Sequence, residues 1–253
     1  MGPNACEGAI RQGGLKTLWV APKAWGRLGA LREEARAVGA AVKEESIEAL
    51  DRMAGGRRHQ GAVGEGEAAK YIGMPELLKI MELRGKEALV LILDGVTDPN
   101  NFGALLRTAA AANVDAAVFP ERRSAQLNDA AMRASAGTAW MVPLARVTNL
   151  GRAIDELKSA GAWVYGMASG DGCRDYLGEK FDTATAIVIG SEGDGLRQKI
   201  RERCDALLKI EMPGRINSLN AAAAAAVALF RVLAVRGAPG SGEISSCSDF
   251  EGR

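Results

Sequence analysis

The sequence has little of what metal sites and disulfide scaffolds require. Its 253 residues include one histidine and four cysteines, and the cysteines are scattered at Cys6, Cys173, Cys204 and Cys247 with no Cys-x-x-Cys pair. A zinc site needs closely spaced nitrogen and sulfur ligands, so this pattern argues against one. Scattered single cysteines in a chain of this size are typical of a reducing compartment, and we expect a cytoplasmic protein without a metal.

The chain also lacks an excess of charge and a long apolar segment. Its 32 Lys and Arg residues nearly balance 31 Asp and Glu residues, so composition alone does not indicate a nucleic-acid-binding protein. The longest near-continuous apolar run, residues 221–230, is shorter than the roughly 20 residues of a membrane helix. The N-terminus has no basic-then-apolar signal pattern, so we expect no membrane association.

From residue 87 onward, apolar strand-like segments alternate with helical ones. Strands are predicted at 89–93, 116–119, 141–144, 163–167, 186–189 and 206–210. Helices are predicted between several of them, including 150–160 and 196–203, and a final helix over 221–236. This alternation predicts an α/β domain over 87–237, with a parallel sheet covered by helices on both faces.

The segments outside this domain differ in composition. Residues 1–68 predict a small α/β unit with helices at 4–11, 27–38 and 46–53 and strands at 18–21 and 40–42. Its basic glycine-rich loop at 55–61 could contact phosphates or be merely solvated, and His59 within it is predicted to be structural or RNA-contacting. Residues 69–86, with an amphipathic piece at 75–83, are the predicted linker, and 238–253 a disordered tail.

The densest functional signal lies at 187–236. The β-branched run 187–189 leads into Gly190-Ser191-Glu192-Gly193-Asp194-Gly195, whose three glycines allow a sharp turn and close approach by a ligand. A second strand ends at Met212-Pro213-Gly214, and Ser218 and Asn220 occupy N-cap positions before the last helix. The spacing is not that of the Gly-x-Gly-x-x-Gly dinucleotide fingerprint. Each signal alone is equally a plain turn or cap, but together they can converge on one ligand.

Three segments in this order resemble the motifs of the SpoU/TrmH methyltransferases. They are 98–108 (Asp-Pro-Asn-Asn-Phe-Gly-Ala-Leu-Leu-Arg-Thr), 189–196 (Ile-Gly-Ser-Glu-Gly-Asp-Gly-Leu), and 210–214 (Ile-Glu-Met-Pro-Gly) with 218–220 (Ser-Leu-Asn). Residues 93–99, 123–128 and 142–150 extend the likeness, which is strongest to the branch that methylates a guanosine 2'-hydroxyl in bacterial 23S ribosomal RNA.

This resemblance implies more than the residue pattern does. It implies S-adenosylmethionine as methyl donor without a metal, an RNA substrate, a homodimer, and residues 1–68 as an RNA substrate-binding domain. It also implies a C-terminal SPOUT domain with a deep trefoil knot, which sequence physics alone would not predict, since knots are rare. Two alternatives stay open: methylation of transfer RNA, and a catalytically silent RNA-binding or ribosome-assembly protein. An unrelated nucleotide-binding α/β protein is disfavoured by the missing phosphate fingerprint.

The resemblance also assigns candidate catalytic residues. Arg107 lies opposite the apolar helical stripe that includes Phe102 and Leu106, a position typical of a solvated arginine, but the resemblance assigns it to the ribose 2'-hydroxyl. Because a guanidinium is not normally deprotonated, a role as phosphate clamp stays open. The implied set is completed by Asn101, expected just before the helix as a cap, and by Glu192, Ser218 and Asn220.

Donor and RNA contacts follow from the same resemblance. Gly190, Ile210 and Leu219 match positions that hold the adenosine part of the donor, largely through backbone groups. The other predicted cofactor-binding residues are Ile189, Met167, Ala168 and Met212. Arginines predicted to contact RNA phosphates are Arg122, Arg123, Arg133 and Arg146, each of which could equally be an ordinary surface charge.

Overall fold

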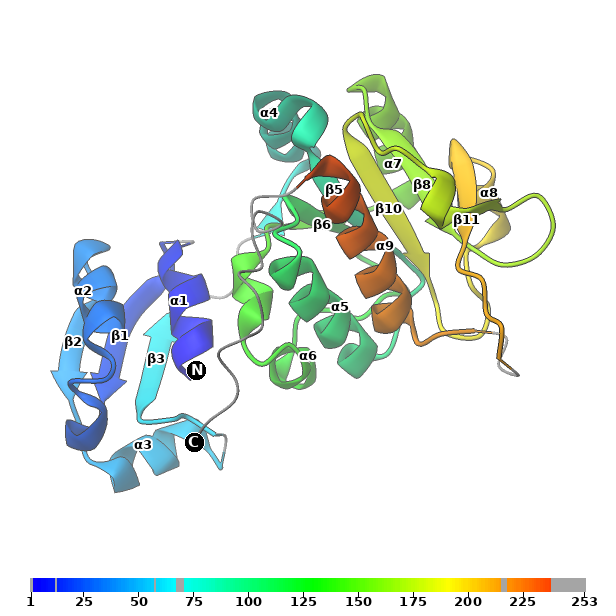
Figure 1. The fold of residues 1–253 in the computed structure, drawn as a ribbon. Helices are drawn as coiled ribbons and strands as arrows, with labels where there is room; N and C mark the ends of the chain where they lie inside the picture. The colour runs from blue at the N-terminus through cyan, green and yellow to red at the C-terminus, as the bar shows by residue number, and fades with distance from the viewer. Residues whose placement is uncertain (1, 12, 57, 67–70, 215–217, 238–253) are drawn as a thin grey trace, which may run out of the picture.

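The computed structural model describes residues 2–11, 13–56, 58–66, 71–214 and 218–237, and the predicted tail at 238–253 lies outside the described residues. These residues form a small N-terminal unit with a three-stranded sheet and a larger unit with an eight-stranded sheet (Figure 1). The predicted α/β class with a parallel main sheet is confirmed.

The small unit packs helices on a mixed sheet. Strand β1 (Leu15–Val20) lies between β2 (Ala41–Glu44), to which it is parallel, and β3 (Ala62–Gly66), to which it is antiparallel. Its helices are α1 (Pro3–Arg11), η1 (Pro22–Ala24), α2 (Gly29–Ala37) and α3 (Ile47–Ala54). The hydroxyl of Ser46 caps α3, as predicted, by accepting a hydrogen bond from the Ala49 amide. Strand β3 was not predicted.

All neighbouring strands of the larger sheet are parallel. Their order is β4-β7-β6-β5-β10-β8-β11-β9. The bounds are β4 (Tyr71–Ile72), β5 (Leu89–Asp94), β6 (Ala116–Pro120), β7 (Leu144–Val147), β8 (Trp163–Met167), β9 (Arg174–Asp175), β10 (Thr185–Gly190) and β11 (Ala206–Lys209). The central strands β5 and β10 are buried along their whole length, which explains their continuous apolar sequences.

Helices cover both faces of this sheet (Figure 1). On one face lie α5 (Pro99–Ala111), α6 (Asp129–Ala134) and α9 (Ala221–Arg236), and on the other lie α4 (Met74–Arg84), α7 (Leu150–Ser159) and α8 (Gln198–Arg201). The short helices are η2 (Gly85–Glu87), η3 (Thr138–Met141) and η4 (Tyr176–Gly178). Alternate residues of β5 point into the two core layers, so Leu91 packs with α5 and α9 while Ile92 packs with α7.

Some predicted boundaries need correction. The strand predicted at 141–144 begins only at Leu144, because residues 138–141 form η3 and Pro143 has no N–H to donate to a sheet ladder. Helix α5 begins at Pro99 with Asp98 as its N-cap, so Asn101 lies in the first turn and is not the cap. The segment predicted as linker contains β4, which joins the large sheet, and α4, whose Leu77 and Met81 are buried in its core.

The two units touch through small residues. Helix α1 packs against η3, and an added Cβ on Gly8 would lie 2.4 Å from Cβ of Trp140. Gly137, which directly precedes η3, is equally close to α1, since an added Cβ on it would lie 2.7 Å from Cβ of Ala5. Figure 1 shows α1 lying between the small sheet and the larger unit. The absence of side chains at these glycines therefore permits close approach of the two units.

Candidate active site

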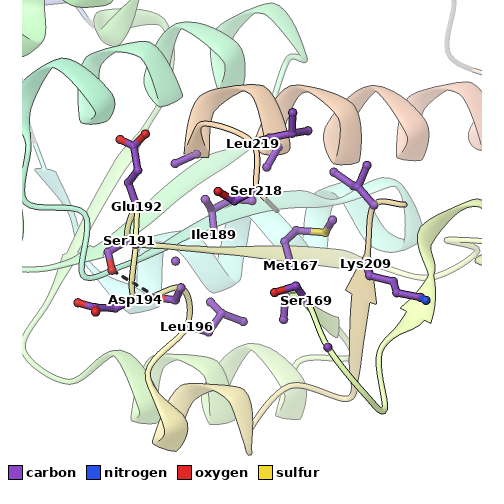
Figure 2. Close-up of a pocket in the computed structure, with 18 of the residues that line it drawn as sticks. Met167, Ser169, Ile189, Ser191, Glu192, Asp194, Leu196, Lys209, Ser218 and Leu219 are labelled. Atoms are coloured by element: carbon purple, nitrogen blue, oxygen red, sulfur yellow. Dashed lines mark hydrogen bonds between the residues drawn. The ribbon is translucent and has the colours of Figure 1, made fainter. Parts of the chain in front are cut away.

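A cavity of about 660 Å³ opens at the carboxyl ends of β8, β10 and β11. Its walls come from Arg201 and from four segments, 167–171, 189–196, 209–212 with 214, and 218–224 in part. Figure 2 shows Met167 and Ile189 on the apolar side of this cavity, with Leu219 above them and Lys209 at one end. All seven predicted cofactor-binding residues line it, namely Met167, Ala168, Ile189, Gly190, Ile210, Met212 and Leu219.

One wall is a tightly closed loop, which we call the glycine loop (residues 190–197). The Ser191 amide donates to the Gly195 carbonyl at 3.1 Å, and the Gly195 amide donates back to the Ser191 carbonyl at 3.0 Å. A Cβ on Gly190 would lie 2.2 Å from the carbonyl carbon of Gly195, so only glycine fits there. Gly193 and Gly195 have φ of 99° and 67°, which glycine adopts at low cost. The three glycines are thus explained by the shape of the loop.

A chain of amide hydrogen bonds joins three of the predicted catalytic residues. Asn220 caps α9 by accepting from the Ala222 amide at 2.9 Å, so its Nδ2 is the group that donates to Oδ1 of Asn101, at 3.0 Å. Nδ2 of Asn101 then donates to Oε2 of Glu192 at 2.7 Å. Each amide therefore has only one orientation that satisfies its partners. The bonded pairs are 91 and 119 positions apart in sequence, and of the three residues Glu192 lines the cavity.

The remaining predicted catalytic residues lie differently. Ser218 is exposed and lines the cavity beside Leu219. Arg107 is exposed on α5, as the periodicity predicted, while Phe102 and Leu106 are buried. It does not line the cavity, and within the described residues its side chain has no hydrogen-bond or ion-pair partner. The structure thus brings Asn101, Glu192 and Asn220 together, adds Ser218 to the cavity wall, and leaves Arg107 outside it.

The four arginines predicted to contact RNA are all exposed. Arg146 stacks on the ring of Tyr71, with its guanidinium carbon 4.5 Å from the ring centre. Arg122 and Arg123 lie on the loop after β6, which is tied to the loop after β5 because the Ala125 amide donates to the Val96 carbonyl at 2.7 Å. Arg133 is in the last turn of α6.

Sequence reasoning missed an ion pair beneath the glycine loop. Asp94, the last residue of β5, is fully buried and accepts from the amide of Arg197 at 2.8 Å and from its Nε at 2.6 Å. The sequence held one signal for this ion pair, an aspartate that ends an otherwise apolar strand. Such a strand is buried, and a buried carboxylate needs a partner.

Two titratable groups near the cavity have a raised pKa. Burial raises the pKa of the Cys204 thiol, which lies behind the wall at Gly166, to about 12. A hydrogen bond to Glu211 raises the pKa of Lys209 at the cavity rim, so this amine stays charged. Neither group is therefore a candidate for proton removal at neutral pH.

Histidine and metal chemistry find no support among the described residues. Nδ1 of His59 accepts from the Gly61 amide at 3.2 Å, so Nε2 carries the proton and donates to Asp51 at 3.0 Å. Both ring nitrogens are thus used in holding the 55–61 loop, which favours the structural role.

No group of three or more His, Cys, Asp or Glu side chains in the described ranges is arranged to hold a metal ion. Nor does any described helix have the length and apolar character needed to cross a bilayer.

A cavity at the carboxyl ends of parallel strands defines an α/β protein with a ligand site in the usual place for this architecture. Comparison with known proteins agrees. Residues 88–230 match the model of the SpoU rRNA Methylase family, and residues 1–72 match the model for RNA 2'-O ribose methyltransferase substrate binding. The chain therefore belongs to the SpoU rRNA methylase family, and the family predicted from the sequence is confirmed.

Individual relatives are similar over most of the chain. The 23S rRNA (guanosine-2'-O-)-methyltransferase RlmB of Xanthomonas campestris pv. campestris is 43% identical over 83% of this chain and 84% of its own length. The protein of the same name from Vibrio cholerae serotype O1 is 41% identical with the same coverage. The crystal structure of an AdoMet-bound rRNA methyltransferase from Sinorhizobium meliloti has a TM-score of 0.70 at 24% identity, over 92% of this chain and 85% of that one. That likeness concerns the fold.

Proposed function

We propose that this protein transfers a methyl group from S-adenosylmethionine to the ribose 2'-hydroxyl of a guanosine in 23S ribosomal RNA. One observation carries the proposal: the hydrogen-bond chain from Asn220 through Asn101 to Glu192 joins the three family motifs, and Glu192 lines the cavity. The relatives named as 23S rRNA guanosine-2'-O-methyltransferases agree with this substrate.

The cavity suits the proposed methyl donor. Its volume of about 660 Å³ lies within the roughly 300–1,000 Å³ of typical small-molecule sites. Met167, Ile189 and Leu219 offer apolar walls for a base, and the backbone of the glycine loop offers polar groups for a ribose. Carboxylates outnumber cationic side chains in the lining, which favours a cationic ligand; they are Asp171, Glu192, Asp194 and Glu211, against Arg201 and Lys209. S-adenosylmethionine supplies a methyl group already activated on a sulfonium, so no metal is required.

The residues of the chain then have mainly positioning roles. The amide chain fixes Asn101 and Glu192, so both present fixed groups to the ribose that enters at the cavity mouth. Ser218, exposed on the same wall, is proposed to hold the ribose or the donor. Arg107 is proposed to act on the 2'-hydroxyl or on an adjacent phosphate, since its guanidinium is exposed and unpaired within the described residues.

The finer architectural expectations belong to the same proposal. We assign residues 1–68 to an RNA substrate-binding domain. The larger unit, which includes β4 and α4 and extends to residue 237, is assigned to a catalytic domain with a C-terminal trefoil knot. A homodimer is supported by α9, where Phe230 is 48% exposed and Ala223 and Ala234 also face solvent. The scattered single cysteines of the sequence favour a cytoplasmic location. Sedimentation of the purified protein would test the dimer.

The deciding experiment measures transfer of a labelled methyl group to undermodified 23S ribosomal RNA and, in parallel, to unmodified transfer RNA. The control is 23S RNA that already carries the ribose methyl group. We expect label on one guanosine ribose of 23S RNA and none on the control. Label only on transfer RNA would replace the proposed substrate. Donor binding without transfer to either RNA, or no donor binding, would overturn the enzymatic assignment in favour of a silent RNA-binding protein.

A further inference from the structure

One buried carboxylate in the larger unit has no part in the proposed catalytic set. Asp94 is the last residue of β5, with 0% of its surface exposed, and it pairs in register with Gly190 at the end of β10. Burial of a charged group is costly unless hydrogen bonds and an opposite charge compensate it. Within the described part of the chain, its compensation comes from a single residue, Arg197.

The contact between Asp94 and Arg197 is polydentate. Oδ2 of Asp94 accepts from the Arg197 amide at 2.8 Å, and Oδ1 accepts from Nε at 2.6 Å and pairs with Nη2. The amide contact fixes the backbone of Arg197, and the guanidinium contacts fix its side chain, 51% of which is exposed. Arg197 closes the glycine loop, so Asp94 determines where that loop ends.

A second contact from the same segment fixes the other part of the loop. Asn101, seven residues after Asp94, donates to Glu192 at 2.7 Å. The β5–α5 segment thus holds the glycine loop both at its tip, through Glu192, and at its end, through Arg197. Between these points, the reciprocal hydrogen bonds of Ser191 and Gly195 close the loop on itself. The conformation of a cavity wall therefore depends on a carboxylate that does not line the cavity.

We propose that Asp94 is a positioning residue that acts through Arg197 to hold the glycine loop in the conformation that receives the methyl donor. The proposal rests on the proposed function for the identity of the ligand. The segment that follows Asp94 leads directly into α5, which carries Asn101 and Arg107. The ion pair thereby couples donor binding at the glycine loop to the helix that is proposed to act on the RNA.

The test compares Asp94→Asn and Arg197→Gln with a matched control, Asp115→Asn. Asp115 has the same chemistry at the opposite end of β5: it accepts from the Leu89 amide at 2.8 Å and pairs with Nε of Arg84 at 2.9 Å, with 11% of its side chain exposed. It is remote from the cavity walls. Thermal unfolding first establishes a temperature at which every variant is folded. Calorimetry with S-adenosylmethionine and amide hydrogen exchange without it are then measured there.

We expect Asp94→Asn and Arg197→Gln to weaken donor binding by about tenfold or more, because each removes a charge-assisted contact. The Ser191 and Gly195 amides should exchange faster in both variants even without donor, whereas Asp115→Asn should change neither quantity. Equal donor affinity and equal exchange in Asp94→Asn and the unaltered protein would overturn the inference. If the unaltered protein itself binds no donor, the proposed function fails, while the exchange data still decide whether Asp94 holds the loop.

Discussion

At the scale of single residues, the site consists of polar side chains that are fixed by one another. The side-chain oxygen of Asn220 accepts the hydrogen bond that caps α9, so only its amide nitrogen is left to donate to Asn101. Asn101 in turn has only its nitrogen left for Glu192. A substitution at Asn101 therefore removes a partner from both of the others, and a substitution at either end removes a partner from Asn101. Their effects on catalysis should not be additive.

Arg107 differs from these residues because nothing described in the chain holds its guanidinium. We expect Arg107→Ala to lower kcat by about a hundredfold or more, because it removes a group proposed to act in the transition state, with donor affinity and thermal stability unchanged. Steady-state kinetics and calorimetry measure these quantities. Arg152→Ala, which removes an arginine whose side chain is 80% exposed on α7, is the control and should keep full activity. Unfolding of Arg107→Ala would instead make Arg107 structural.

The glycine loop makes a steric prediction. Gly190→Ala places a Cβ 2.2 Å from the carbonyl carbon of Gly195, so the loop must open. We expect a loss of about 1–3 kcal/mol in the free energy of unfolding, together with loss of donor binding. Gly178→Ala is the control, since its added Cβ has no heavy atom within 4 Å. Denaturant unfolding and calorimetry measure both effects, and normal donor binding by Gly190→Ala would remove this loop from the proposed site.

At the scale of elements, the sequence predicts best where one physical signal dominates. Strands β8 and β10 and helix α9 are continuous apolar segments with clear ends, and they lie where expected to within a residue. The strand predicted at 141–144 lies three residues too early, because the apolar sequence that precedes β7 begins already in η3. The cavity residues were found through the motif resemblance. The Asp94–Arg197 pair was missed because the strand pattern marks the buried aspartate but not its partner, which lies 103 positions away.

The contact between α1 and η3 gives the prediction that belongs to this scale. Replacing a helical glycine by alanine normally stabilises a helix by up to about 1 kcal/mol. We expect Gly8→Ala to do the opposite and lower the free energy of unfolding, because the new methyl group would meet Trp140 at 2.4 Å. Gly29→Ala, whose Cβ meets only the guanidinium of Arg32 at 3.8 Å, should be neutral or stabilising. Denaturant unfolding measures both, and a stabilised Gly8→Ala would show that the two units do not pack closely.

At the scale of the whole molecule, each unit has its own core. Residues of α1, β1, β3 and the neighbouring helices form the small core, and the two faces of the large sheet form the other two clusters. The units share the α1–η3 contact, which is built mostly from small side chains. Because separate cores joined by a limited contact can open separately, the small unit is expected to lose its structure before the large one.

Two thiols, the buried Cys6 and the partly buried Cys204, report on the two units individually. Burial raises the pKa of Cys6 in the small core to about 11 and that of Cys204 in the large unit to about 12. Because only the thiolate reacts, direct labelling of both thiols should be slow at pH 8 and should grow as the pH approaches these values. In a variant with Cys173→Ser and Cys247→Ser, we expect urea to expose Cys6 at a lower concentration than Cys204, as measured by mass spectrometry after thiol labelling. Simultaneous exposure would mean that the α1–η3 contact joins the two units into one cooperative structure.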